Sequence, residues 1–116
     1  MFILTYSLFG SSKLFERIQA ELDWGKASTL ALCKSYNETL PTYERLEKMF
    51  VSNPYFLYNY AAVLQEMKQY TESLEVALKC RQYWADYDLE LIIGENYQQL
   101  NKPELAEKYY NSASMM

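Results

Sequence analysis

Hydrophobic and polar positions between Asn53 and Ala113 follow nearly the same order twice. When Ala61 is placed over Gly94, the two passages align at a separation of 33 residues. The other matching pairs are Leu64 and Tyr97, Met67 and Leu100, Tyr70 and Pro103, Ser73 and Ala106, Ala77 and Tyr110, and Cys80 and Ala113. Self-similarity at this period is typical of a helical solenoid, in which each unit buries its apolar face against the next.

Apolar residues within these passages recur at the spacing of a helix, which predicts amphipathic helices. Asn53 and Asp86 are suitable N-caps, and Pro54 and Pro103 suit the first turn of a helix. The expected helices cover residues 54–67, 70–84, 89–100 and 105–115.

The N-terminal half shows the same periodicity less regularly. A helix is predicted from about residue 12 to at least Trp24, on the apolar positions Leu14, Phe15, Ile18 and Leu22. It either ends at Gly25 or continues to residue 36, because a glycine inside a helix costs about 1 kcal/mol relative to alanine. We expect a turn at residues 37–39 and a further helix over residues 41–51.

The connections between these helices are short, so neighbouring helices are expected to be antiparallel. Small residues fall where paired helices must approach closely, at Ala61 and Gly94 in the first helix of a pair and at Ser73 and Ala106 in the second. A larger side chain at these positions would push the helices apart.

Composition narrows the functional classes. A net charge of −4 argues against nucleic-acid binding, which needs a basic face. The absence of histidine removes the commonest general base and metal ligand, so we expect no catalytic residues, no metal site and no cofactor. Cys33 and Cys80 lie within apolar helical patterns and are expected to be buried, reduced core residues.

The first nine residues form an apolar run that is too short to span a bilayer, which takes about 20 such residues. The run lacks the basic region of a signal peptide. Residues 1–10 are therefore either a packing arm or the stub of a transmembrane helix, and residues 11–116 form the helical domain. We favour the stub because so apolar a segment has no obvious partner in an acidic domain.

The C-terminal passage resembles the tetratricopeptide repeat. It reads Leu89-x-x-x-Ile93-Gly94-x-x-Tyr97-x-x-Leu100, then Ala106-x-x-x-Tyr110-x-x-Ala113. Residues 57–80 match less strictly, and residues 26–54 keep only the outline, without the small residue of the first helix or the alanine of the second. The resemblance implies an all-α, right-handed solenoid of antiparallel helix pairs with about three repeats, at residues 26–53, 54–86 and 87–116.

A narrower resemblance rests on the whole arrangement. The apolar start, Asn53-Pro54-Tyr55-Phe56, the stretch 93–100 and the terminal Met pair look like the C-terminal repeat segment of Bacteroides-type O-antigen ligases or polymerases. This resemblance implies a preceding catalytic membrane domain and a place at the bacterial inner membrane, with the repeats in cytoplasm or periplasm. The alternative is a free-standing cytoplasmic protein.

In the repeat family the first helix of each pair lines a concave face that holds an extended peptide. The resemblance therefore implies a partner-binding groove for a protein or peptide. Its candidate residues are Tyr55, Tyr58, Asn59, Ala62, Gln65, Glu66, Leu91, Ile92, Glu95, Gln98 and Gln99, with Lys34 and Trp24 extending the row. The alternative is that helix packing takes Tyr58 and Leu91 and that solvent takes the amides. A carboxylate clamp is not expected, because Asn59 lies beside acidic Glu66 and Glu95.

The chain stops directly after the second helix of a pair, without the capping helix that usually closes a solenoid. We therefore expect the flank formed by Leu105, Tyr109, Ala113 and Met116 to contact another molecule, with a homodimer as one outcome. The sequence thus predicts a non-catalytic interaction scaffold, either within a polysaccharide ligase or polymerase or as a soluble peptide-binding protein.

Overall fold

The computed structural model describes residues 2–116, with side chains from Lys13 onward. Six α-helices and no strand make up this part of the chain: α1 (Phe2–Leu32), α2 (Tyr36–Leu46), α3 (Pro54–Glu66), α4 (Tyr70–Arg81), α5 (Tyr87–Gln99) and α6 (Pro103–Ser114). The predicted all-α class is confirmed, and the four helices after Asn53 lie where their apolar spacing and caps place them.

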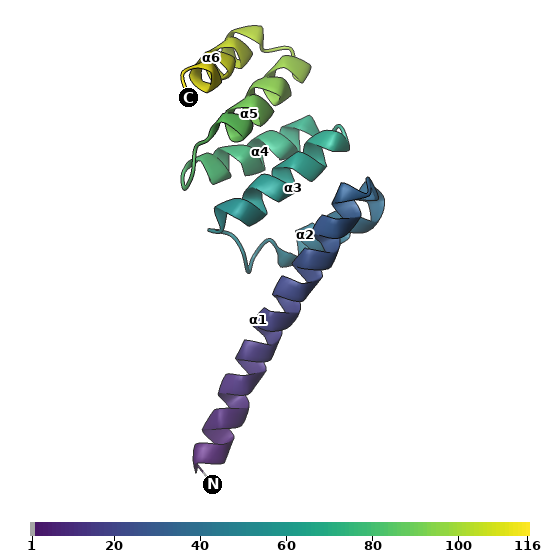
Figure 1. Ribbon diagram of the computed structural model, residues 1–116, viewed down its shortest axis with the longest axis vertical. Helices are drawn as coiled ribbons and strands as arrows, with labels where there is room; N and C mark the ends of the chain where they lie inside the picture. The colour runs from purple at the N-terminus through teal and green to yellow at the C-terminus, as the bar shows by residue number, and fades with distance from the viewer. Residues whose placement is uncertain (1) are drawn as a thin grey trace.

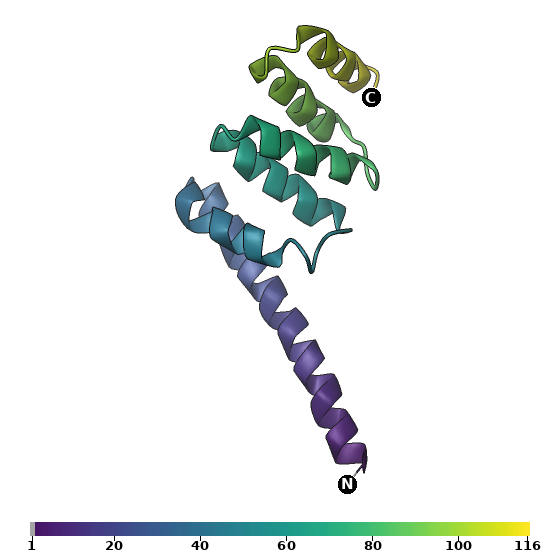
Figure 2. The ribbon, with the colours of Figure 1, turned by 180° about the vertical axis from the view of Figure 1, so that it is seen from behind.

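The helices form three antiparallel pairs that stack one after another, α1 with α2, α3 with α4 and α5 with α6 (Figure 1). The N-terminal half of α1 extends away from this stack, and the C-terminus lies at the opposite end (Figures 1 and 2). The molecule is accordingly elongated, with extents of 64 × 28 × 20 Å. Each pair buries one side against the next, as the predicted solenoid requires.

The turn inside each pair has the same backbone conformation. Lys34, Lys68 and Asn101 have φ angles of 63°, 62° and 61°. In each case the following amide donates back to the carbonyl five residues earlier, from Ser35 to Leu30, Gln69 to Leu64 and Lys102 to Tyr97, at 2.9 Å each. This Schellman geometry satisfies carbonyls at the end of the first helix. Its threefold recurrence shows that α1 and α2 form a repeat equivalent to the other two pairs.

The first repeat does contain the small residues that its sequence was predicted to lack. Ala27 of α1 and Thr39 of α2 are buried where Ala61 and Ser73 lie in the second repeat. Ser73 Oγ donates to the Ala61 carbonyl at 2.7 Å, and Thr39 Oγ1 lies 3.5 Å from the Ala27 carbonyl. The prediction was wrong because the first two repeats are offset by 34 residues, one more than the 33 between the second and third.

The helix α2 starts earlier than expected. Residues 37–39 were predicted to form a turn, but they belong to α2, and the prediction that the helix begins at Pro41 was wrong. Burial of Thr39, Tyr43 and Leu46 on one face explains this outcome, since these three positions are spaced along a single side of the helix. Pro41 is exposed on the other side, so its missing N–H removes only one bond near solvent. Turns replace the predicted helix after Leu46.

The first helix is continuous through Gly25, which resolves the two sequence alternatives in favour of one long helix ending at Leu32. The predicted arm or stub at residues 1–10 lies outside the residues whose side chains the structure describes. Among the helices that are described, none combines the length and apolarity needed to cross a membrane.

An aromatic cluster joins the first two repeats. Trp24 lies 5.2 Å from Phe50 and 5.5 Å from Phe56, measured between ring centroids. Tyr43 and Tyr60 stack at 5.6 Å beside them. Trp24 had been expected to extend the row of groove residues, but it packs into this cluster. The cluster fixes α1 and α2 against α3, and thereby shapes the face that α1 and α3 share.

Candidate functional site

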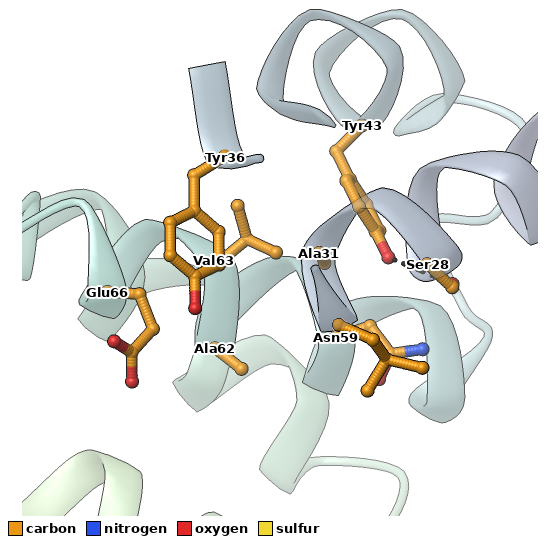
Figure 3. Close-up of a pocket in the computed structure, with 9 residues that line it drawn as sticks. Ser28, Ala31, Tyr36, Tyr43, Asn59, Ala62, Val63 and Glu66 are labelled. Atoms are coloured by element: carbon orange, nitrogen blue, oxygen red, sulfur yellow. Dashed lines mark hydrogen bonds between the residues drawn. The ribbon is translucent and has the colours of Figure 1, made fainter. Parts of the chain in front are cut away.

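Two cavities lie along α3 and share one residue, Asn59. The first, of about 310 Å³, lies between the first and second repeats (Figure 3). Its lining consists of Ser28, Ala31 and Leu32 from α1, Tyr36 and Tyr43 from α2, and Asn59, Ala62, Val63 and Glu66 from α3. The walls are mostly apolar, which suits a hydrophobic side chain of a partner.

Polar groups in the first cavity gather at its two ends (Figure 3). Tyr36 and Glu66 lie at one side, while Tyr43 and Ser28 lie at the other, with their hydroxyl oxygens 3.2 Å apart. Burial raises the pKa of Tyr43. The cavity therefore offers an apolar centre with a carboxylate at one end and neutral hydroxyls at the other.

The second cavity, also of about 310 Å³, lies where α3 and α5 begin and α4 ends. It is lined by Pro54, Tyr55, Tyr58, Asn59, Cys80, Trp84, Asp86, Asp88 and Leu89. Burial raises the pKa of Tyr58, and the neighbouring charges of Asp88 and Asp86 raise it further. The hydroxyl of Tyr58 is therefore a neutral donor beside two carboxylates.

Cys80 at the base of the second cavity is not set up for nucleophilic chemistry. Its Sγ donates to the Pro54 carbonyl at 3.3 Å, and burial together with Asp86 raises the thiol pKa to about 11. A thiol at this pKa is protonated at neutral pH, whereas the thiolate is the reactive form. Cys33, predicted to be buried like Cys80, is exposed, because it follows α1 on the side that no helix covers.

The structure brings four of the predicted groove residues together around the cavities. Tyr55 and Tyr58 line the second cavity, Glu66 lines the first, and Asn59 lines both. The α5 residues Leu91, Glu95, Gln98 and Gln99 line neither of them. Gln98 instead accepts a 2.8 Å hydrogen bond from the Tyr110 hydroxyl.

Gln65 belongs to a polar network that connects the second and third repeats. Its Nε2 donates to the Ile92 carbonyl at 3.0 Å and to Asn96 Oδ1 at 3.1 Å. Asn96 Nδ2 donates in turn to Ser73 Oγ at 2.9 Å. Asn96 and Ser73 are fully buried, so these bonds satisfy groups that burial would otherwise leave unpaired. The Gln65 amide thus holds α3 to α5.

Several cavity residues were not predicted from the sequence, namely Ser28, Ala31, Leu32, Tyr36, Trp84, Asp86 and Asp88. A signal for two of them was present. At an offset of 34 residues Ala31 and Leu32 align with Gln65 and Glu66, which were predicted. Lys34, predicted to extend the row, occupies the exposed turn after α1.

Carboxylates dominate the charge around these cavities. Glu66 lines the first cavity, while Asp86 and Asp88 line the second. Asp86 also caps α5 by accepting from the Leu89 amide at 2.9 Å. Within the described residues, no three acidic or cysteine side chains are grouped so as to hold a metal ion. The arrangement fits recognition of a partly apolar, partly cationic ligand.

No family model matches the sequence. No curated protein matches it either. Among solved structures, the chain is similar to a point mutant of MamA, with a TM-score of 0.78 and 12% identity over 82% of this chain and 53% of that one. A structure of MamA AMB-1 gives a TM-score of 0.77 and 12% identity over 82% and 57%.

The chain thus spans a little over half the length of the MamA structures it matches. MamA contains tetratricopeptide repeats. The likeness therefore confirms that this chain has the predicted tetratricopeptide-like, all-α solenoid fold.

Proposed function

We propose that this chain is a non-catalytic scaffold that holds an extended peptide along α3. The observation that carries the proposal is that Asn59 lines both cavities, so that one peptide following α3 reaches each of them. The first cavity takes an apolar side chain between Ala31 and Val63. The second takes a Lys or Arg side chain near Asp86 and Asp88. Tetratricopeptide-like folds support this role because stacked repeats form extended concave surfaces.

The test is a selection of random peptides from a display library on the immobilised 116-residue chain. Enriched peptides should combine an apolar residue with Lys or Arg, and their affinity should fall as salt rises. Asn59→Arg places a long cationic side chain between the cavities and should weaken binding at least tenfold. Asn111→Arg on α6 makes the same chemical change at an exposed position and should leave binding unchanged.

Two results would overturn the groove proposal: no enriched peptide, or enriched peptides that bind the Asn59→Arg variant as tightly as the parent chain. Equal losses in the Asn59→Arg and Asn111→Arg variants would also count against it, because a general charge effect would then explain the loss. Circular dichroism of both variants establishes that each remains helical.

We further propose that the chain is the repeat domain of a membrane-embedded O-antigen ligase or polymerase at the bacterial inner membrane. The support is the sequence resemblance over Asn53–Phe56 and residues 93–100. The genomic sequence upstream of the Met1 codon tests it. An in-frame series of about ten hydrophobic segments would support it. A stop codon before any such segment would leave the free-standing peptide-binding protein as the better proposal.

A further inference from the structure

Helix α1 carries apolar residues on two opposite sides. One side packs against the neighbouring helices through Ala20, Trp24, Ala27 and Ala31. The other side presents Phe15, Ile18 and Leu22, which are 73%, 45% and 55% exposed. A helix turns about 100° per residue, which places these two sets roughly 180° apart. Burial within the domain therefore accounts for only one of the two apolar sides.

The exposed side repeats with the period of a coiled coil. Phe15, Ile18 and Leu22 are separated by three and four residues, and exposed Gly25 and Thr29 continue the same alternation. Towards the N-terminus the sequence has Leu4 and Leu8 at the same spacing, with Ser11 between them and Phe15. A mean period of 3.5 residues keeps one stripe facing a second helix, as in supercoiled helices.

Charges beside the stripe complement those of an identical helix. Glu21 precedes Leu22 at the g position and Lys26 follows Gly25 at the e position, and both side chains are exposed. In a parallel pair, a g residue faces the e residue five positions further along the partner, so that Glu21 faces Lys26 in both directions. An antiparallel pair would bring equivalent positions together and place Glu21 near Glu21.

The charge balance disfavours a membrane surface as the occupant of this stripe. Residues 13–26 contain three basic residues, Lys13, Arg17 and Lys26, and three acidic residues, Glu16, Glu21 and Asp23. Helices that lie on membranes are instead rich in Lys and Arg on their polar face. The whole chain is acidic as well, with a net charge of −4.

We propose that this chain forms a parallel homo-oligomer through the exposed face of α1, defined by Phe15, Ile18, Leu22, Gly25 and Thr29. Leu at an a position with Ile at a d position favours more than two strands in parallel coiled coils. Exposed Leu14 at a g position widens the apolar stripe in the same sense. The expected assembly has two to four copies. This interface is separate from the cavities along α3 and does not depend on the proposed peptide.

Light scattering coupled to size-exclusion chromatography tests the proposal on the full 116-residue chain. The parent chain should show the mass of two to four copies, and Ile18→Asp should weaken association at least tenfold, since it places a charge in the apolar stripe. Leu105→Asp makes the same kind of change on exposed α6 and should leave association unchanged. Thermal unfolding followed by circular dichroism establishes that both variants fold. A monomeric parent chain, or loss of association only in Leu105→Asp, would overturn the proposal.

Cysteine crosslinking tests the parallel orientation. In a Cys33→Ser background, Phe15→Cys and Thr29→Cys should each crosslink to an identical copy, because both lie at a positions. Crosslinks only between position 15 of one copy and position 29 of another would show an antiparallel pair and overturn the parallel arrangement. Sedimentation with phosphatidylglycerol vesicles provides the last arm. A monomer that binds vesicles and loses binding in Ile18→Asp would show a lipid-facing stripe instead.

Discussion

Arg81 at the end of α4 forms an ion pair with Glu90 of α5, with Arg81 Nε 2.6 Å from Glu90 Oε1. The Glu90 side chain is fully buried, and Arg81 Cζ also lies 5.2 Å from the centre of the Tyr109 ring on α6. The hydrogen bond to Glu90 raises the pKa of Arg81. This one guanidinium therefore links three helices of the second and third repeats.

Replacing Arg81 by Ala should lower the free energy of unfolding by about 3 kcal/mol, because it leaves the buried Glu90 carboxylate without its cation. Lys79→Ala on the same helix is the control. Lys79 Nζ lies 3.8 Å from Glu47 Oε1 in a solvent-accessible pair, so its loss should cost less than about 1 kcal/mol. Urea unfolding of both variants measures the difference. Equal effects would mean that the Arg81 pair contributes no more than a surface contact.

Gly94 and Gly25 should respond to alanine in opposite directions. A methyl group on Gly94 would lie 2.7 Å from Tyr110 Cε1, so Gly94→Ala should destabilise the fold by about 1–2 kcal/mol despite the better helix propensity of alanine. Nothing lies within 4 Å of a methyl group on Gly25, so Gly25→Ala should stabilise the fold by about 1 kcal/mol. Thermal unfolding measures both, and destabilisation by both substitutions would contradict this account.

Stability should fall at alkaline pH. Burial, with Glu47 nearby, raises the pKa of Tyr60 from 10.0 to about 12, and burial raises that of Cys80 from 9.0 to about 11. The folded state therefore favours the neutral forms, and this stabilisation is present below the unfolded values and is lost between about pH 9 and pH 12. Urea midpoints measured across this range should decline. Tyr60→Phe should make the decline shallower, while Tyr87→Phe, at an exposed position, should leave the slope unchanged.

The two thiols should react at very different rates. Cys33 is exposed, whereas Cys80 is buried and donates to the Pro54 carbonyl. A maleimide reagent at neutral pH should therefore modify one thiol per native chain and two in denaturant. Mass spectrometry identifies the modified residue, and Cys33→Ser should abolish the native reaction. Rapid native labelling of Cys80 would show that the end of α4 opens readily.

The cavities show how far sequence reasoning about a binding site extends. The repeat spacing placed Tyr55, Tyr58, Asn59 and Glu66 on one face of α3, and these residues do line the cavities. The same spacing could not separate them from Gln65, whose amide bonds across to α5. That distinction depends on how α3 and α5 cross, which no local pattern specifies.

The predicted C-terminal flank shows the same limit. Leu105 and Met116 are exposed, but Ala113 is buried and Tyr109 stacks on Tyr97 with centroids 5.6 Å apart. Ala113 and Tyr109 therefore lie within the third repeat, and including them in an exposed flank was wrong. Contact of another molecule with Leu105 and Met116 stays a prediction.

The sequence by itself determined the helices after Asn53, their caps and the repeat, because helical period, proline position and capping side chains act within a few residues of one another. Tertiary structure decided the rest. It set the register of the first repeat at Ala27 and Thr39, carried α1 through Gly25, and left one apolar side of α1 uncovered. The physical reason is that a helix with two apolar sides buries whichever side its neighbours reach, and this depends on contacts between segments distant in the chain.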